Sequence, residues 1–159
     1  MTMRVIVCVV FIIYGIFQRV SAAPVFENFD SMEWEEGDII TCRLNGFWGM
    51  LFAKHFMLAS DDNSVINVVG DKSTHDGTIL KQKRIKAHGF DRSKCSNRGK
   101  GKLPVTVALE RAQNWLNRNV YYDLIRCNCQ HWVKYWTDGT SGGFFENQSG
   151  LPTNKKCAI

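Results

Sequence analysis

Short apolar runs separated by turn residues are the clearest pattern in the first half of the chain. Two of the runs, Ile39–Leu44 and Ser64–Val69, are rich in β-branched residues, and short apolar runs between turn signals are typical of β-strands. Asp61–Asn63 lies between two of the runs and can turn the chain back on itself. Thr78–Ile85 is a further candidate strand, although its charged residues weaken the pattern. We therefore predict an antiparallel β-meander whose first three strands are Ile39–Leu44, Leu51–Ala59 and Ser64–Val69.

The pattern becomes helical after residue 104. Between Val105 and Leu116 the apolar residues recur three and four positions apart, which predicts an amphipathic helix with Thr106 as its N-cap. Val120–Arg126 has the composition of one more strand, and Cys129–Asp138 that of a second, short helix. A meander followed by a helix, a strand and a helix predicts the α+β class.

The N-terminal segment has the composition of a secretory signal. Arg4 supplies a positive charge, Val5–Phe17 is almost entirely apolar, and small residues follow up to Ala22. The apolar run is shorter than the ~20 residues that a bilayer-spanning helix needs. We expect residues 1–22 to be a signal peptide that is cleaved before Ala23; the alternative is an uncleaved signal anchor. No second apolar run of this length follows, so the mature chain is expected to be secreted, without a transmembrane segment.

The rest of the chain is long enough for one domain with one core, residues 23–140, followed by a polar tail, residues 141–159. Loss of Arg4 and Arg19 with the signal lowers the formal net charge from +5 to +3. This mild charge argues against a nucleic-acid partner, because nucleic-acid-binding proteins concentrate basic residues on one face. We interpret the basic, glycine-containing run Ser93–Lys102 as a solvated, flexible loop in preference to a binding site for anionic headgroups.

The mature chain contains an odd number of cysteines. In an oxidising compartment at least one thiol is then left without an intramolecular partner. If Cys129 is that thiol, the other four can form two disulfides in any of three connectivities. Asn147 lies in an N-glycosylation sequon, which is expected on the surface. The other four cysteines are Cys42, Cys95, Cys127 and Cys157.

Cys129 is the candidate nucleophile. It opens a predicted helix, and the unpaired N–H groups and partial positive charge of a helix N-terminus favour a thiolate. The candidate base is His55, which shares one face of its predicted strand with Met57 and Ala59. Pairing of this strand with the next one brings Asn67 near His55, where the Asn67 carbonyl can accept the proton of one ring nitrogen. The expected set is Cys129, His55 and Asn67, although strand patterns alone do not bring Cys129 to the other two.

Each of these residues also has a structural alternative. A histidine in an apolar strand can be an ordinary core or surface residue, and Cys127 and Cys129 can both be disulfide partners. His131 competes as a base, but it lies two positions beyond Cys129 on the predicted helix and is turned away by roughly 200°. His131 could instead bind zinc with the two cysteines, but the motif lacks a well-spaced fourth ligand. We therefore expect neither a metal nor a cofactor.

The motif around Cys129 resembles a known family. Asn128–Val133, N-C-Q-H-W-V, is similar to the N-C-E-H-F-V signature of the lecithin:retinol acyltransferase-like (LRAT) domain, a permuted relative of the NlpC/P60 thiol hydrolases. The similarity extends over roughly Trp34–Gly139, with the histidine before the cysteine. The other matching segments are Glu36–Ile40, similar to the G-D-L-I that opens the domain; Lys54–Phe56 with Val65–Asn67, similar to its histidine-bearing strands; and Leu103–Leu116, similar to its L-P-containing helix.

The resemblance implies a permuted papain-like core, in which an antiparallel meander packs on helices. It further implies that Cys129 attacks an ester of a glycerophospholipid to form a thioester, with His55 as the general base. Asn67 stands where the family usually has a second histidine. Two other features depart from the family: the tail is polar where lipid-processing members carry a hydrophobic segment, and Trp136–Gly139 replaces the usual R-Y-G.

The favoured function is a secreted thiol acyltransferase or phospholipase A1/A2-type hydrolase. Its substrate would be a phospholipid or another acyl ester, presented at a membrane surface. One alternative is an NlpC/P60-like amidase or peptidase with the same residues, for which a polar cleft would be expected. The other is a catalytically inactive, disulfide-stapled secreted binding module, for which a disulfide at Cys129 would be expected.

Overall fold

The computed structural model describes residues 25–46, 53–71, 75–123 and 127–140. The predicted signal peptide, the polar tail with Asn147 and Cys157, and the first two residues of the predicted strand Leu51–Ala59 lie outside these ranges. No helix within the described residues is long and apolar enough to cross a membrane.

The strands form a six-stranded antiparallel sheet with the order β5-β1-β2-β3-β4-β6. The predicted meander is confirmed, because β1 to β4 are neighbours in chain order, and β4 confirms the weak fourth strand. The strand β5 returns to the outer edge of β1. The bounds are β1 Asp38–Leu44, β2 Lys54–Asp61, β3 Ser64–Asp71, β4 Asp76–Lys83, β5 Phe90–Lys100 and β6 Asn119–Tyr121.

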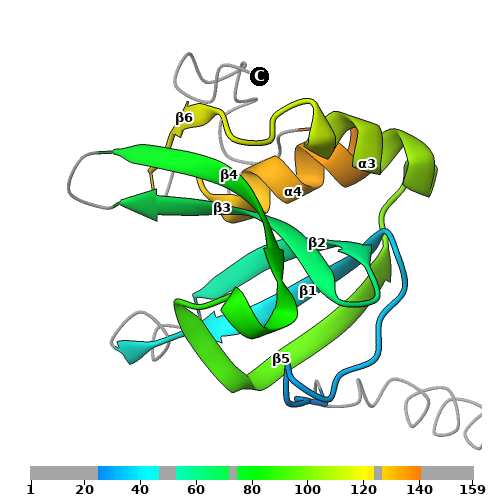
Figure 1. Cartoon of the computed structure of the whole chain (residues 1–159), viewed down its shortest axis with the longest axis vertical. Helices are drawn as coiled ribbons and strands as arrows, with labels where there is room; N and C mark the ends of the chain where they lie inside the picture. Colours follow the sequence, from blue (N-terminus) through cyan, green and yellow to red (C-terminus); the bar gives the residue numbers. More distant parts are fainter. Residues whose placement is uncertain (1–24, 47–52, 72–74, 124–126, 141–159) are drawn as a thin grey trace, which may run out of the picture.

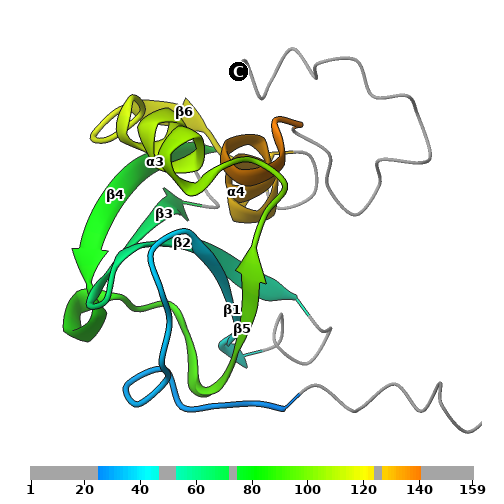
Figure 2. The same ribbon diagram turned by 90° about the vertical axis from the view of Figure 1, so that its right-hand side faces the viewer.

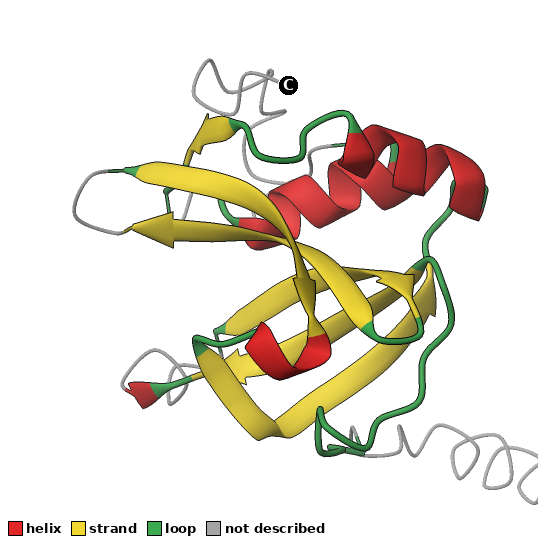
Figure 3. Cartoon of the chain, viewed as in Figure 1, coloured by secondary structure: helices red, strands yellow, loops and turns green. Residues whose placement is uncertain are grey.

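Two α-helices, α3 Val105–Gln113 and α4 Cys129–Asp138, lie together over one side of the sheet (Figure 1). The predicted α+β class is therefore confirmed (Figure 3). The helix α4 packs against α3, β2 and β3. A short 3₁₀ turn, η1 Arg84–Lys86, joins β4 to β5. In the perpendicular view the segment before β1, drawn in blue, begins at the end of the molecule away from the two helices (Figure 2), and it ends at Gly37 beside Val105 of α3.

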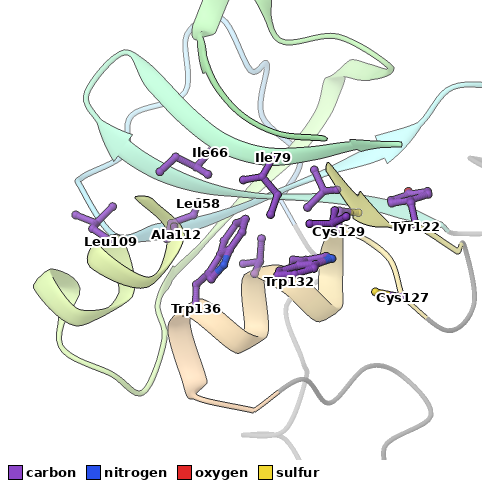
Figure 4. Packing of buried hydrophobic residues seen from close by; sticks show 13 residues of the cluster. Leu58, Ile66, Ile79, Leu109, Ala112, Tyr122, Cys127, Cys129, Trp132 and Trp136 are labelled. Atoms are coloured by element: carbon purple, nitrogen blue, oxygen red, sulfur yellow. The ribbon is translucent and has the colours of Figure 1, made fainter. Parts of the chain in front are cut away.

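The sheet separates two apolar clusters because successive side chains of a strand point to opposite faces. On the helix face, Leu58 of β2 packs with Trp132 and Trp136 of α4 (Figure 4). On the opposite face, Met57 of β2 packs with residues of the segment before β1, among them Phe29. We call these the helix-face core and the outer core; complete burial of such a side chain contributes roughly 1.5–3 kcal/mol.

Three sequence predictions differ from the structure. Ser93–Lys102 is not a flexible loop: most of it belongs to β5, an edge strand whose polar sequence lacks apolar alternation. Thr106 is not the N-cap of α3, because the helix begins at Val105 after Pro104. Of the predicted strand Val120–Arg126, Val120 and Tyr121 belong to β6, Tyr122 and Asp123 do not, and residues 124–126 lie outside the described ranges.

Candidate active site around Cys129

The start of α4 is held by a capping box. The Asn128 side chain accepts a hydrogen bond from the Gln130 backbone N–H at 2.9 Å, and the His131 ring accepts one from the Asn128 N–H at 3.2 Å. These bonds satisfy N–H groups that a helix N-terminus otherwise leaves unpaired. Cys129 is therefore the first residue of α4, as predicted. The His131 side chain is part of the capping box that stabilises the start of this helix.

The sulfur of Cys129 lies against the backbone of β2. The Phe56 N–H donates a hydrogen bond to Sγ at 3.4 Å, and Sγ is 3.9 Å from the Lys54 carbonyl oxygen. The β2–β3 register stops at the pair Met57–Asn67, so this part of the β2 edge is not paired with β3. Alternate peptide groups of a strand point to the same edge. The thiol thus contacts the two backbone groups that flank His55, the Lys54 carbonyl and the Phe56 N–H, where a neighbouring strand would otherwise pair.

The thiol is buried and protonated at rest. The side chain is free of any disulfide, and the residue is only 4% exposed. Burial raises the pKa of the Cys129 thiol, while the N–H groups of Phe56 and Gln130 and the Tyr122 hydroxyl oppose that rise. The same donors would stabilise a thiolate once one formed.

Tyr122 is a site residue that the sequence did not reveal. Its hydroxyl makes a side-chain hydrogen bond with Cys129, and burial raises the pKa of Tyr122, so the hydroxyl keeps its proton. Figure 4 shows the two residues at the same end of the helix-face core. The ring packs on Gly70 and Gly77, which face each other across β3 and β4; a Cβ at Gly70 would collide with the ring. The sequence signal that could have indicated this contact is the pair of glycines at matching positions of the β3–β4 hairpin, because two glycines leave room for an aromatic ring.

Replacement of Tyr122 by phenylalanine tests this hydrogen bond. The variant retains the ring but loses a donor to the thiolate, a contact worth about 1.5–3 kcal/mol. We expect the pKa of the Cys129 thiol to rise by roughly one unit or more, and iodoacetamide labelling at pH 8 to slow by about tenfold. Tyr121→Phe is the matched control, because its hydroxyl contacts Asp123 instead. Equal labelling rates in the two variants would remove Tyr122 from the site.

His55 and Asn67 lie side by side in the structure. The Asn67 amide nitrogen is 3.2 Å from His55 Nε2 and also donates to Gln82 Oε1 at 3.1 Å. The group that meets the ring is therefore the amide nitrogen, and not the carbonyl oxygen that we expected. Because an amide nitrogen only donates, Nε2 is the acceptor and the ring proton is on Nδ1. Asn67 Oδ1 is buried without a partner among the described residues.

The imidazole and the sulfur are on different faces of β2. The His55 ring stacks on Phe90 of the outer core, with ring centroids 5.7 Å apart and planes 13° from parallel. Cys129 belongs to the helix-face core. Among the described residues, Asn67 is the hydrogen-bond partner of the His55 side chain, and Cys129 is not. The structure thus brings His55 and Asn67 together, as expected. It places the Cys129 sulfur against Phe56, the residue next to His55, and not against the His55 ring.

The ionisation states of the two groups match. Burial lowers the pKa of His55 to about 4, helped by repulsion from the charge of His88. His55 is therefore neutral near pH 7, and so is the buried thiol, whose pKa is raised. A neutral pair differs from the thiolate–imidazolium pair of thiol enzymes whose cysteine has a lowered pKa.

Thiol labelling as a function of pH should show this difference. Because the thiolate is the reactive form, the labelling rate of a neutral thiol rises roughly tenfold per pH unit below its pKa. We expect this rise to continue from about pH 6 to beyond pH 8 in the non-reduced protein. A plateau of constant rate through neutral pH would instead show a preformed ion pair. His55→Ala, measured in parallel, identifies the partner if such a plateau is found.

The zinc alternative does not fit the cysteines. Cys127 is disulfide-bonded, so its sulfur cannot be a thiolate ligand. His131 contacts Asn128 through Nδ1 in the capping box. Within the described ranges, no cluster of three or more histidine, cysteine, aspartate or glutamate side chains is arranged to hold a metal ion.

The site combines a free thiol, several donors directed at its sulfur and a neutral imidazole on the adjoining strand position. These are the kinds of group that nucleophilic catalysis by a cysteine requires. A scan against known protein families finds no family model that matches the chain, and a search of the curated proteins finds no match. The likeness to the acyltransferase motif therefore depends on the residues of this chain alone.

Proposed function

We propose that the chain is a secreted, cysteine-dependent acyltransferase or phospholipase A1/A2-type hydrolase with a permuted papain-like core of the LRAT kind. One observation carries the proposal. Cys129, the first residue of α4, has a free thiol that accepts a hydrogen bond from the Phe56 N–H, and Phe56 is next to His55 on β2. Cys129 is the nucleophile, His55 the general base, and Asn67 the residue that positions the ring.

In the proposed reaction the Cys129 sulfur attacks the carbonyl carbon of an acyl ester. His55 accepts the thiol proton as the carbon–sulfur bond forms, and returns it to the alcohol oxygen as the carbon–oxygen bond breaks. The product is a thioester on Cys129, which water or an acceptor alcohol or amine then cleaves. The Cys129 N–H and the Tyr122 hydroxyl are the donors proposed for the negative oxygen of the tetrahedral intermediate.

The reaction requires His55 to turn toward the sulfur when substrate binds. In the resting structure its Nε2 lone pair is used by Asn67, and the ring lies on the outer core. The pKa of His55 is low, so the ring is in the neutral form that a base needs. Rotation would exchange one hydrogen bond for another and would move the ring across a single strand.

Secretion fits the oxidised cysteines. Cys42 and Cys95 form a disulfide, and Cys127 is disulfide-bonded as well. Disulfides form and persist mainly in oxidising compartments. Together with the predicted signal peptide, these bonds support an extracellular substrate, which we propose to be a phospholipid or another acyl ester at a membrane surface.

A non-catalytic binding module is the second candidate. It is favoured by the burial of Cys129 and by the hydrogen bond that directs the His55 ring to Asn67. In such a protein the thiol would be a core residue that packs against β2. The free thiol is a feature that the catalytic candidate requires.

Acyl-enzyme trapping separates these candidates. The mature, non-reduced protein is incubated with phospholipid vesicles, with a p-nitrophenyl acyl ester and with the matching anilide, and then analysed by intact mass and peptide mapping. We expect one acyl group on Cys129 from the esters, removed by neutral hydroxylamine as a thioester is. Acylation from the anilide alone would favour the amidase. An unmodified Cys129 with all three compounds would favour the binding module.

A further inference from the structure

A chain of three polar side chains crosses the outer face of the sheet. His55 Nε2 lies 3.2 Å from the Asn67 amide nitrogen, which also donates to Gln82 Oε1 at 3.1 Å. The three residues belong to β2, β3 and β4, which are neighbours in the sheet (Figure 1). Asn67 is paired directly with Met57, and Gln82 with Val65; both partners belong to the outer core, and directly paired residues share a face. The candidate base is thus connected to Gln82 through an apolar layer.

Gln82 is the member of this chain that reaches the surface. His55 and Asn67 are buried, whereas Gln82 is half-buried. Among the described residues the Asn67 amide is the hydrogen-bond partner of the Gln82 side chain. The Gln82 amide can therefore turn and present its nitrogen in place of its oxygen, because water is available to the end that faces away from Asn67.

The Asn67 amide uses only one of its two ends. Nδ2 serves both neighbours, while Oδ1 is buried with no partner among the described residues. An amide nitrogen donates and an amide oxygen accepts, so Nδ2 faces Gln82 for as long as Gln82 presents Oε1. If Gln82 presents its nitrogen, Asn67 must turn Oδ1 toward it, and Nδ2 becomes the unused end. Both orientations make the same number of hydrogen bonds, and the end that Gln82 presents decides between them.

The orientation of Asn67 determines where the imidazole carries its proton. The ring is neutral at pH 7, because burial lowers the pKa of His55 to about 4, so one of its two nitrogens is protonated. When Nδ2 of Asn67 faces the ring, Nε2 is the acceptor and Nδ1 carries the proton. When Oδ1 faces the ring, two lone pairs meet unless Nε2 takes the proton or the ring turns away. Either change releases a lone pair of the imidazole, which a general base needs.

We propose that Gln82 is a positioning residue of the candidate site, which selects the tautomer of His55 through the Asn67 amide. With Gln82 Oε1 on Asn67, the imidazole is held at rest, because one ring nitrogen carries the proton and the other accepts from Asn67. The part that Gln82 plays in the reaction rests on the proposed function. The link from Gln82 to His55 does not, since a tautomer can be observed without turnover.

The tautomer of His55 can be read directly by NMR. Long-range proton–nitrogen correlation spectra of the isotope-labelled, non-reduced mature protein are recorded at pH 7, where protonated and unprotonated ring nitrogens have well-separated shifts. His55→Ala identifies the signals. In the wild type we expect the proton on Nδ1. Gln82→Glu, whose carboxylate only accepts, should keep this tautomer, whereas Gln82→Met, of similar length and without a hydrogen bond, should shift the Nε2 signal toward the protonated value.

Lys83→Met is the matched control. Its side chain is exposed and alternates with Gln82 to the opposite face of β4, so the wild-type tautomer should remain. The proposal is overturned if Gln82→Met keeps the wild-type tautomer, or if Nε2 carries the proton in the wild type. A shift of the same size in both methionine variants would overturn it as well, because the effect would then not pass through Asn67.

Turnover keeps this inference separate from the proposed function. On a soluble acyl ester we expect the kcat of Gln82→Glu to fall by about tenfold with KM unchanged, because a charged acceptor holds the Asn67 amide more firmly. A wild-type kcat in Gln82→Glu would overturn the role of Gln82 in the reaction. If even the wild type hydrolyses no ester, the proposed function fails, and the NMR spectra alone decide whether Gln82 positions His55.

Discussion

Replacement of Cys129 by serine is expected to reduce ester turnover by at least about 10³-fold and to abolish the acyl adduct. The change is nearly isosteric and leaves an atom that can accept the Phe56 N–H, which contacts the wild-type sulfur at 3.4 Å. A serine hydroxyl, however, has a far higher pKa than a thiol. The imidazole that the proposal assigns to the thiol is therefore a much poorer match for a serine hydroxyl. The measurement is kcat/KM on a soluble acyl ester, together with intact mass after incubation with substrate.

The stability of Cys129→Ser provides its control. The residue is buried in the helix-face core, so the melting temperature is recorded for the wild type and for both Cys129→Ser and Cys129→Ala. We expect the serine variant to unfold within a few degrees of the wild type, corresponding to a change of roughly 1 kcal/mol. A variant that is folded and inactive identifies the nucleophile. Retained turnover in a folded Cys129→Ser protein would show that another group performs the reaction.

The sequence located most accurately the elements whose ends contain capping or turn residues. The helix α4 begins after Asn128, whose side chain caps it, and ends at Gly139, which adopts a left-handed conformation with φ 78°. The turn between β2 and β3 contains Asp61, whose carboxylate accepts the Asn63 N–H. Both signals act within a few residues and therefore remain visible without the tertiary structure.

The strand β5 could not be found in this way. Its polar residues lack apolar alternation, because it is an edge strand and much of it faces solvent. What holds it is long-range pairing with β1, including the Cys42–Cys95 disulfide. The consequence extends to the candidate site, because the same strand carries Phe90, whose ring stacks on His55.

The geometry of the candidate site was predictable only in part. Strand alternation and the β2–β3 turn brought Asn67 to His55, as the hydrogen bond between them shows. The position of the sulfur depends on where the β2–β3 pairing stops and on the packing of α4 against β2, β3 and α3, neither of which a local sequence pattern reveals. Tyr122 reaches the thiol through its fit to Gly70 and Gly77, which is equally a tertiary effect.

Removal of the Cys42–Cys95 disulfide is expected to lower the free energy of unfolding by about 4 kcal/mol. The bond closes a loop with a sequence separation of 53 residues, and in the chain-entropy account a loop of this length gives roughly that stabilisation. The measurement is denaturant unfolding of Cys42→Ala/Cys95→Ala against the wild type. A double variant is preferable to a reductant, because Cys127 is also disulfide-bonded and would be reduced as well.

The same bond should influence the candidate site. Cys42 is paired with His55 across β1 and β2, and Cys95 belongs to the strand that carries Phe90. Loss of the disulfide is expected to loosen edge strand β5 and with it the stacking of Phe90 on His55. We therefore expect the folded double variant to lose turnover of a soluble acyl ester in addition to stability. A loss of less than about 1 kcal/mol, with turnover intact, would show that the hydrogen bonds between β1 and β5 hold the edge strand without the disulfide.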